Sequence, residues 1–207
     1  MSSSAEAFDL FRQYLPTYLN PTQARDLFSE LSKFPDNQSV YLHGPVDGPL
    51  QGDGWKGLVA INFHTGARKV LSGVILSNSC DISPDYAQNH PVNLLFSPLI
   101  ELKKYTERLS AAGKSNEQIG DICQAIRRQK VTDIFYLPEL PEVLGESIIL
   151  LHDIHAHPLD DFLKQERSLL FTLNQYGFYL FLMKLSIHFS RFNEKVQRYP
   201  VSPAQTG

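Results

Sequence analysis

Cysteine and long apolar runs are both scarce in this chain. Only two of its 207 residues are cysteines, Cys80 and Cys123, which is too few for a disulfide framework and fits a reducing compartment. The most apolar stretch, residues 178–183, is far shorter than the roughly 20 residues needed to cross a bilayer. The first residues lack the basic and apolar regions of a signal peptide. We therefore predict a cytoplasmic protein without membrane association.

Sequence signatures of nucleotide and cofactor binding are also missing. The chain has no Walker loop, no GxGxxG and no GxSxG segment, so we predict no cofactor. Its net charge of -3 does not suit nucleic acid as a partner of the whole molecule. Basic residues are nevertheless concentrated between residues 101 and 130, where they form either an RNA-contacting face or an ordinary solvated helix surface. The residues that could contact RNA are Lys103, Lys104, Arg108, Arg127, Arg128 and Lys130.

The chain does contain an ordinary globular composition, with 43% hydrophobic and 20% charged residues. This is enough to bury one core, and we predict a single domain over residues 1–199 followed by a flexible tail at residues 200–207. Apolar residues spaced three and four apart predict helices over residues 5–15 and 22–33, within a helical lead-in that spans residues 1–38.

The apolar pattern becomes that of strands within residues 40–98. Segments 57–63, 70–76 and 92–96 are short, apolar and rich in branched side chains, which predicts three strands. Short turns join them, whereas parallel strands would need longer crossovers. The strands should therefore form an antiparallel meander or a small barrel.

Helical patterns return in the second half of the chain. We predict a two-helix insertion over residues 99–130, in which Ser115 and Gln118 have the spacing of a capping box. Two further strands are expected within residues 131–157. A long helix over residues 174–193 follows, apolar around most of its circumference and therefore buried or at an interface. Helices and strands segregate along the chain, which predicts the α+β class.

Eight residues of the central block follow the order seen in a known family. They are Gly52, Asp53, Asn62, Phe63, Gly66, Ser77, Asn78 and Pro98. In this order they resemble the opening of the MazF/PemK family of toxin barrels. The resemblance implies an SH3-like antiparallel β barrel or a strongly curved sheet and, in active members, metal-independent cleavage of RNA. It also implies catalytic roles for Arg68, Ser77 and Ser97.

The chain departs from that family at two catalytic positions. The family's Arg-Pro pair before the second strand is absent, because the chain has Lys69 and Val70 there, and no hydroxyl follows Pro98. The outer parts of the chain, residues 1–40 and 99–207, have no counterpart in a minimal toxin of this type. An eroded catalytic pattern with added helices favours a protein that binds a partner.

A polar segment directly after the predicted strand at residues 70–76 is a candidate for chemistry. Cys80 could act as a nucleophile there and Asp81 as a general base, provided that a base lies near the thiol. Alternatively, the segment caps the strand end, and Cys80 packs as a small apolar side chain.

A second polar segment contains three metal-ligating residue types. Asp153, His155 and His157 point to one face of an extended strand and could bind zinc. The outer two would lie roughly 13 Å apart, however, so chelation needs a bend. A solvated strand end is the alternative, and we predict no metal.

The sequence supports two hypotheses of function. The first is an interaction protein, a MazF-like barrel that binds a protein partner or itself within a bacterial defence or toxin–antitoxin-like module. The alternative is a metal-independent endoribonuclease of the MazF/PemK type that uses Arg68, Ser77 and Ser97. Cleavage of RNA in EDTA, lost in Arg68→Ala, would separate the two.

Overall fold

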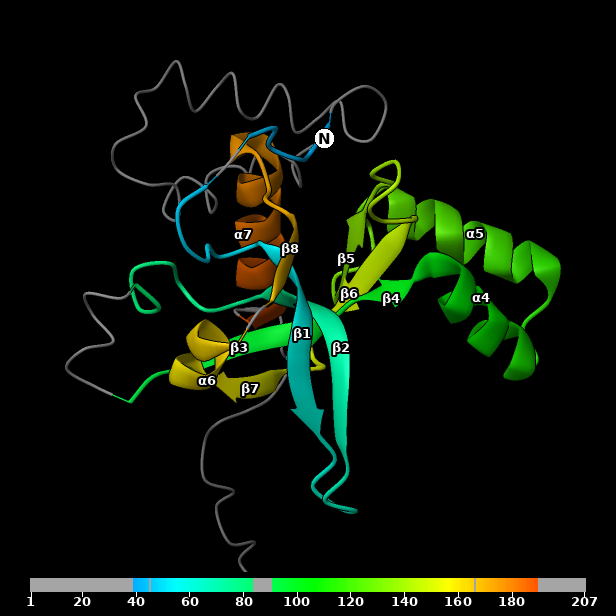
Figure 1. Cartoon of the computed structure of the whole chain (residues 1–207). Coiled ribbons are helices and arrows are strands. Elements are labelled where there is room, and N and C mark those ends of the chain that lie inside the picture. Colours follow the sequence, from blue (N-terminus) through cyan, green and yellow to red (C-terminus); the bar gives the residue numbers. More distant parts are fainter. Residues whose placement is uncertain (1–38, 45, 84–90, 166, 190–207) are drawn as a thin grey trace, which may run out of the picture.

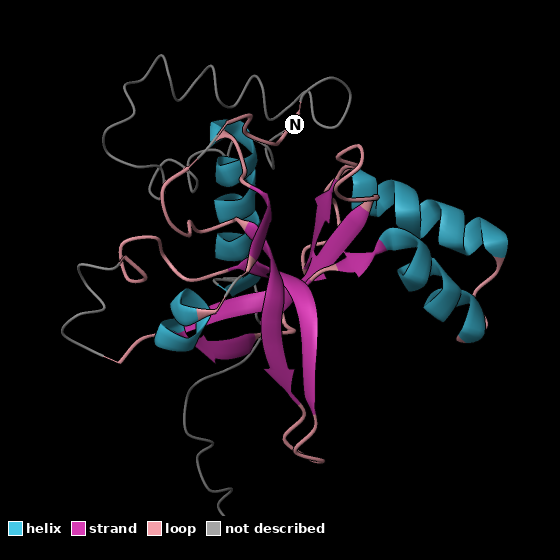
Figure 2. Ribbon diagram, in the orientation of Figure 1, coloured by secondary structure: helices cyan, strands magenta, loops and turns pink. Residues whose placement is uncertain are grey.

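The computed structural model describes residues 39–44, 46–83, 91–165 and 167–189. Over these residues the chain forms two antiparallel β-sheets flanked by helices (Figures 1 and 2). The predicted α+β class is confirmed. The helices predicted at residues 5–15 and 22–33 and the tail at residues 200–207 lie outside the described residues.

The larger sheet has five strands. They are β1 (Gly54–Ile61), β2 (Arg68–Ile75), β3 (Asn93–Pro98), β7 (His155–Pro158) and β8 (Ser168–Phe171). Their order is β7-β3-β2-β1-β8, and each neighbouring pair is antiparallel. The three strands predicted within residues 40–98 correspond to β1, β2 and β3, and they form the predicted meander. Leu58, Ile75 and Phe96, one from each strand, bury their side chains in one apolar cluster.

A smaller sheet lies beside the insertion. It consists of β4 (Ile100–Glu101), β5 (Ile134–Leu137) and β6 (Ser147–Leu150) in the order β4-β6-β5. The predicted two-helix insertion forms α4 (Leu102–Ala111) and α5 (Asn116–Arg127). The capping box is confirmed, because Ser115 Oγ accepts from the Gln118 N–H and the Gln118 side chain accepts from the Ser115 N–H. Ile126 of α5 packs with Ile148 of β6, which joins the insertion to this sheet.

The larger sheet bends strongly. Two strands separate β7 from β1 in the sheet order, so a flat sheet would place them roughly 14 Å apart. Yet the Val59 N–H in β1 donates to Nδ1 of His157 in β7 over 3.1 Å. A register shift at Gly57, whose φ is 90°, helps β1 to bend. Among the described residues, strand pairing still ends at β7 and β8, so the sheet there is strongly curved but open, and the predicted barrel is not confirmed.

The predicted long helix forms α7 (Gln175–Phe189), and a short helix, α6 (Leu159–Lys164), follows β7. Phe181 of α7 is fully buried, and its ring centroid lies 5.2 Å from that of Phe135 in β5. Lys184 is also buried, and its ammonium donates to the carbonyl oxygens of Gln129 and Val131 just after α5. Burial lowers the pKa of Lys184 to about 8. The predicted helix is confirmed over residues 175–189, but it is buried only in part: six of its residues are buried, whereas Ile187 and Phe189 in the last turn are 37% and 61% exposed.

A carboxyl group is buried just before β1. Asp53 is fully buried, and its Oδ2 accepts a 2.9 Å hydrogen bond from the Leu50 N–H. Within the described residues its Oδ1, the Trp55 ring N–H and the Thr172 hydroxyl form no hydrogen bond of good geometry, although Thr172 and Trp55 lie close enough to influence the carboxyl. Burial raises the pKa of Asp53 to about 6, although Leu50, Thr172 and Trp55 lower it in part.

Candidate functional site

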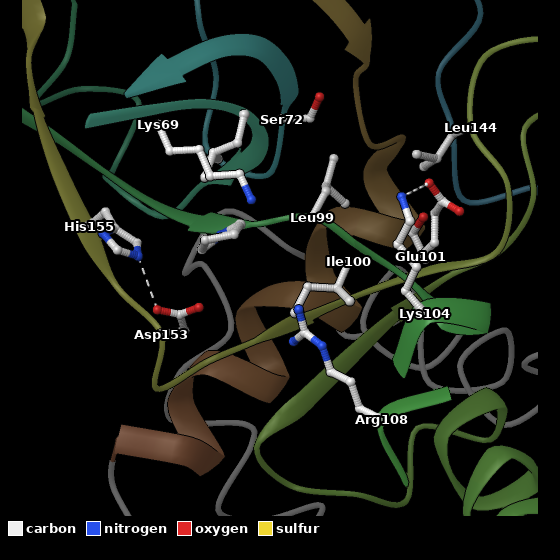
Figure 3. A pocket seen from close by; sticks show the side chains of 13 residues that line it. Lys69, Ser72, Leu99, Ile100, Glu101, Lys104, Arg108, Leu144, Asp153 and His155 are labelled. Carbon is white, nitrogen blue, oxygen red and sulfur yellow. Dashed lines mark hydrogen bonds and ion pairs between the residues drawn. The ribbon is translucent and has the colours of Figure 1, made fainter. Parts of the chain in front are cut away.

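A cavity of about 500 Å³ lies where the two sheets meet the insertion (Figure 3). Its wall comes from β2, the β3–β4 connection, α4, β6 with the loop before it, and the segment that leads into β7. The lining residues are Lys69, Leu71, Ser72, Pro98, Leu99, Ile100, Glu101, Lys104, Arg108, Leu144, Ser147, Asp153 and His155. This volume lies within the usual range for small-ligand sites.

Local periodicity explains which charged side chains reach the cavity. Lys69 and Leu71 are two residues apart in β2 and therefore share one face of the strand. Lys104 and Arg108 are four residues apart in α4 and therefore share one face of the helix. The two elements thus direct an ammonium and a guanidinium group towards the same space from different sides.

The cavity contains two cations that are not neutralised by a neighbour. Lys104 pairs with Glu101 over 2.7 Å, and both side chains are largely exposed. Lys69 and Arg108 have no ion-pair partner in the part of the chain that the structure describes, and their charged ends point into the central space (Figure 3). An anion that enters the cavity would therefore meet two available cations.

A histidine–carboxylate pair forms another part of the wall. His155 Nε2 lies 3.0 Å from Asp153 Oδ1, and the imidazole ring stacks on Phe96 with centroids 5.5 Å apart. The His155 side chain is 23% exposed, so it is held in place and still accessible. Because an ionised carboxylate only accepts hydrogen bonds, Nε2 carries the proton and Nδ1 is left as an acceptor. This is the arrangement of a general base with an orienting carboxylate.

Of the three predicted metal-ligating residues, the structure brings only two together. Asp153 and His155 form the pair described above. The buried His157 instead lies 2.6 Å from Asp161 Oδ2 through Nε2 and accepts from the Val59 N–H through Nδ1. No group of three or more His, Cys, Asp or Glu side chains in the described ranges is placed to hold a metal ion. The three residues are therefore not one ligand set.

The structure does not bring Arg68 together with Ser77 and Ser97. Arg68 begins β2, whereas Ser97 pairs with Val74 six residues further along, roughly 20 Å away at the rise of a strand. Ser97 is buried, and its hydroxyl donates to the Leu150 carbonyl over 2.9 Å. Ser77 Oγ accepts from the Leu95 N–H over 2.8 Å. Both serines thus connect strands, and Ser97 connects the two sheets.

Cys80 and Asp81 lie in an exposed turn after β2. The Cys80 N–H donates to Asn78 Oδ1 over 2.9 Å, and the Asp81 N–H donates to the Asn78 carbonyl over 3.1 Å. Ser79 Oγ accepts from the Gln51 N–H over 2.9 Å, which attaches the turn to the loop before β1. These contacts agree with a capped strand end, but the expectation that Cys80 packs as a small apolar side chain is wrong, because the thiol is exposed. Neither Cys80 nor Asp81 lines the cavity.

The six residues predicted to contact RNA have different environments. Lys104 and Arg108 line the cavity, while Lys103, Arg128 and Lys130 are exposed elsewhere. Arg127 donates to both oxygens of Glu146 over 2.7 and 2.8 Å, and the Tyr136 hydroxyl donates to the same carboxylate. The bonds from Arg127 hold the pKa of Glu146 below its ordinary value. Arg127 therefore joins α5 to the smaller sheet.

Sequence reasoning did not identify Lys69 as a site residue. Its strand position and its spacing from Leu71 were visible in the sequence. α4 and the β6–β7 segment lie around the same cavity as Lys69 only because strands distant in the sequence pair with one another. No local sequence pattern indicates that pairing.

No model of a known protein family matches the sequence, and no curated protein matches it either. The resemblance of residues 52–98 to the MazF/PemK family therefore stays a prediction. No helix among the described residues is both long and apolar enough to span a membrane.

Proposed function

We propose that the cavity binds RNA and cleaves its backbone without a metal ion. The observation that carries this proposal is that the His155–Asp153 pair and two cations without ion-pair partners, Lys69 and Arg108, line one cavity. Cleavage of RNA by its own 2′-hydroxyl needs a base for that hydroxyl and positive charge near the phosphate. The cavity offers both.

In the proposed reaction His155 Nδ1 takes the proton of the ribose 2′-hydroxyl. The 2′-oxygen forms a bond to phosphorus, the bond from phosphorus to the 5′-oxygen breaks, and the leaving oxygen takes a proton from water. The hydroxide left behind takes the proton held by His155, which restores the neutral imidazole. The products are a 2′,3′-cyclic phosphate and a 5′-hydroxyl end. Lys69 and Arg108 stabilise the negative charge on the phosphate oxygens, because charge-assisted hydrogen bonds strengthen as that charge grows. Asp153 orients the imidazole and stabilises its protonated form.

The composition of the cavity supports an RNA ligand over a simple anion. Three basic side chains face two carboxylates there, a net charge of about one positive unit in a chain of net charge -3. Between the charged groups, Leu71, Leu99 and Ile100 provide apolar surface. A nucleotide fits this combination, because it joins an anionic phosphate to a flat base with apolar faces.

The test is incubation of the purified full chain with mixed-sequence RNA in EDTA, followed by analysis of the new ends. We expect 2′,3′-cyclic phosphate ends and no cleavage of a 2′-O-methylated RNA. His155→Gln should slow cleavage by about 100-fold or more, whereas His152→Gln, in an exposed histidine three residues earlier, should not. Lys69→Gln and Arg108→Gln should each slow it by about 100-fold, with Lys103→Gln as the matched control. Intact RNA after incubation with the wild-type protein would contradict the proposal.

One observation favours a second candidate function, that of an interaction protein. The hairpin of β1 and β2 exposes apolar side chains, of which Phe63 is 95% exposed and Val70 69% exposed. Such residues are typical of a surface that a partner covers. On this hypothesis the curved sheet is an open relative of the MazF-like barrel, retained as a scaffold in a defence or toxin–antitoxin-like module. Absence of RNA cleavage together with a stable complex in solution would favour it.

A further inference from the structure

The β1–β2 hairpin, here called the arm (residues 54–75), extends beyond the rest of the larger sheet (Figure 1). Three large apolar side chains near its end face solvent. Phe63 in the turn is 95% exposed, Val70 is 69% exposed and Ile61 is 38% exposed. Exposed apolar residues scattered singly are normal, but these three lie on one projecting element.

The two faces of the arm differ. Ile61 pairs with Arg68, and paired residues of antiparallel strands project from the same face. Val70 lies two residues after Arg68 and therefore shares this face, here called the outer face. Lys69 lies between them and points to the opposite face, where it lines the cavity. The outer face thus combines aliphatic side chains with one guanidinium. None of Ile61, Arg68 and Val70 lines the cavity, whereas Ser72, further along the same side of β2, does.

The charge of the arm restricts what can cover the outer face. No aspartate or glutamate occurs between Gly54 and Cys80, whereas Lys56, Arg68 and Lys69 are basic. Two arms of identical chains would bring like charges together, which disfavours self-association through this face. RNA would match the charge, and Phe63 could stack on one base, but Val70 and Ile61 offer a nucleic acid neither a stacking surface nor a charge. Aliphatic side chains beside an arginine suit a protein segment that has apolar side chains and carboxylates.

We propose that the outer face, together with Phe63, is a docking surface for an acidic, partly apolar segment of another protein. Arg68 pairs with a carboxylate of that segment, since guanidinium and carboxylate groups match in geometry. Phe63, Val70 and Ile61 bury against its apolar side chains and supply most of the affinity. The occupied surface lies on the reverse side of the strand that carries Lys69. This inference deepens the second candidate function, that of an interaction protein, and does not depend on the proposed reaction.

The experiment is a selection of displayed random peptides on the full-length protein. A parallel selection uses the double variant Phe63→Ser/Val70→Thr, which keeps a branched side chain in the strand. We expect the wild type to enrich peptides that have net negative charge and apolar residues. Their affinity should fall about tenfold or more for the double variant and for Arg68→Gln, and stay unchanged for Lys103→Gln. Thermal unfolding of each variant shows that the fold is kept.

Several outcomes would overturn the docking surface. The wild type could enrich no more peptides than the double variant does, or it could enrich neutral or basic peptides. The enriched peptides could also bind the wild type and the variants with equal affinity. Binding of single-stranded RNA or of phosphatidylserine vesicles that requires both Phe63 and Val70 would assign the face to a different occupant. The RNA-cleavage assay on the double variant separates the two proposals. Cleavage should be unchanged, because neither substituted side chain lines the cavity.

Discussion

Replacing Asp53 by asparagine should raise the free energy of unfolding at neutral pH. The carboxyl is fully buried, and burial raises its pKa from 3.8 to about 6. One pKa unit corresponds to about 1.4 kcal/mol, so ionising this group in the folded protein costs at most about 3 kcal/mol. Asparagine removes the charge and keeps an oxygen that accepts from the Leu50 N–H. The amide N–H group of asparagine would face another donor, the Trp55 ring N–H, as well as the Thr172 hydroxyl. The gain in free energy of unfolding is therefore smaller than the cost of ionisation that is removed.

The sign of the pH dependence follows from the raised pKa. Below the unfolded-state pKa, Asp53 is protonated in both states and costs the wild type no stability. The free energy of unfolding of the wild type then falls as the pH rises through the folded pKa of about 6. Urea unfolding of the wild type and Asp53→Asn, from about pH 4 to about pH 7, measures the difference. We expect the variant to gain stability relative to wild type as the pH rises. Asp81→Asn, at an exposed carboxylate, is the control. A difference that is independent of pH, or a variant that is less stable at neutral pH, would refute the reasoning.

Two further predictions concern the curved sheet. His157→Ala should lower the free energy of unfolding by about 2–4 kcal/mol, because it leaves a void and removes the acceptor of the Val59 N–H. His157→Asn, which offers an oxygen in its place, should lose less, and equal losses would contradict the role of this bond. Gly73→Ala should cost about 2 kcal/mol or more, since its Cβ would lie 2.8 Å from the Ser97 carbonyl oxygen. Gly120→Ala, in open space on α5, should instead stabilise the protein by up to about 1 kcal/mol. Both comparisons use urea unfolding.

Elements with strong local patterns could be predicted from the sequence. Branched apolar runs located β1, β2 and β3, and the capping box at Ser115 located the start of α5. The strand β8 was missed, because it is only four residues long and buries only one of them fully, Phe171. Two strands were expected within residues 131–157, and they correspond to β5 and β6, whereas β7 was missed. A turn separates β6 from β7 and sends them to different sheets.

The candidate site was only partly visible in the sequence. Asp153 and His155 were identified as chemically capable, but with His157 as a third ligand. Strand alternation cannot show that His157 turns inward to close the curved sheet while His155 lines a cavity. The roles given to Arg68 and Ser97 came from a family likeness, and they assumed a register in which the two residues meet. In the observed register about six residues of β2 separate them.

The single residue between β3 and β4 limits where the cavity can change shape. Leu99 is the only link between Pro98 in the larger sheet and Ile100 in the smaller one, and its N–H donates to the Ser72 carbonyl. Together with the bond from Ser97 to Leu150, this link joins the two sheets directly beside the cavity. The rest of the wall comes from α4, the loop at Leu144 and the segment that carries Asp153 and His155, and it lies outside this junction. Substitutions there are expected to change the shape of the cavity, and with it the preferred ligand, while the contact between the sheets is kept.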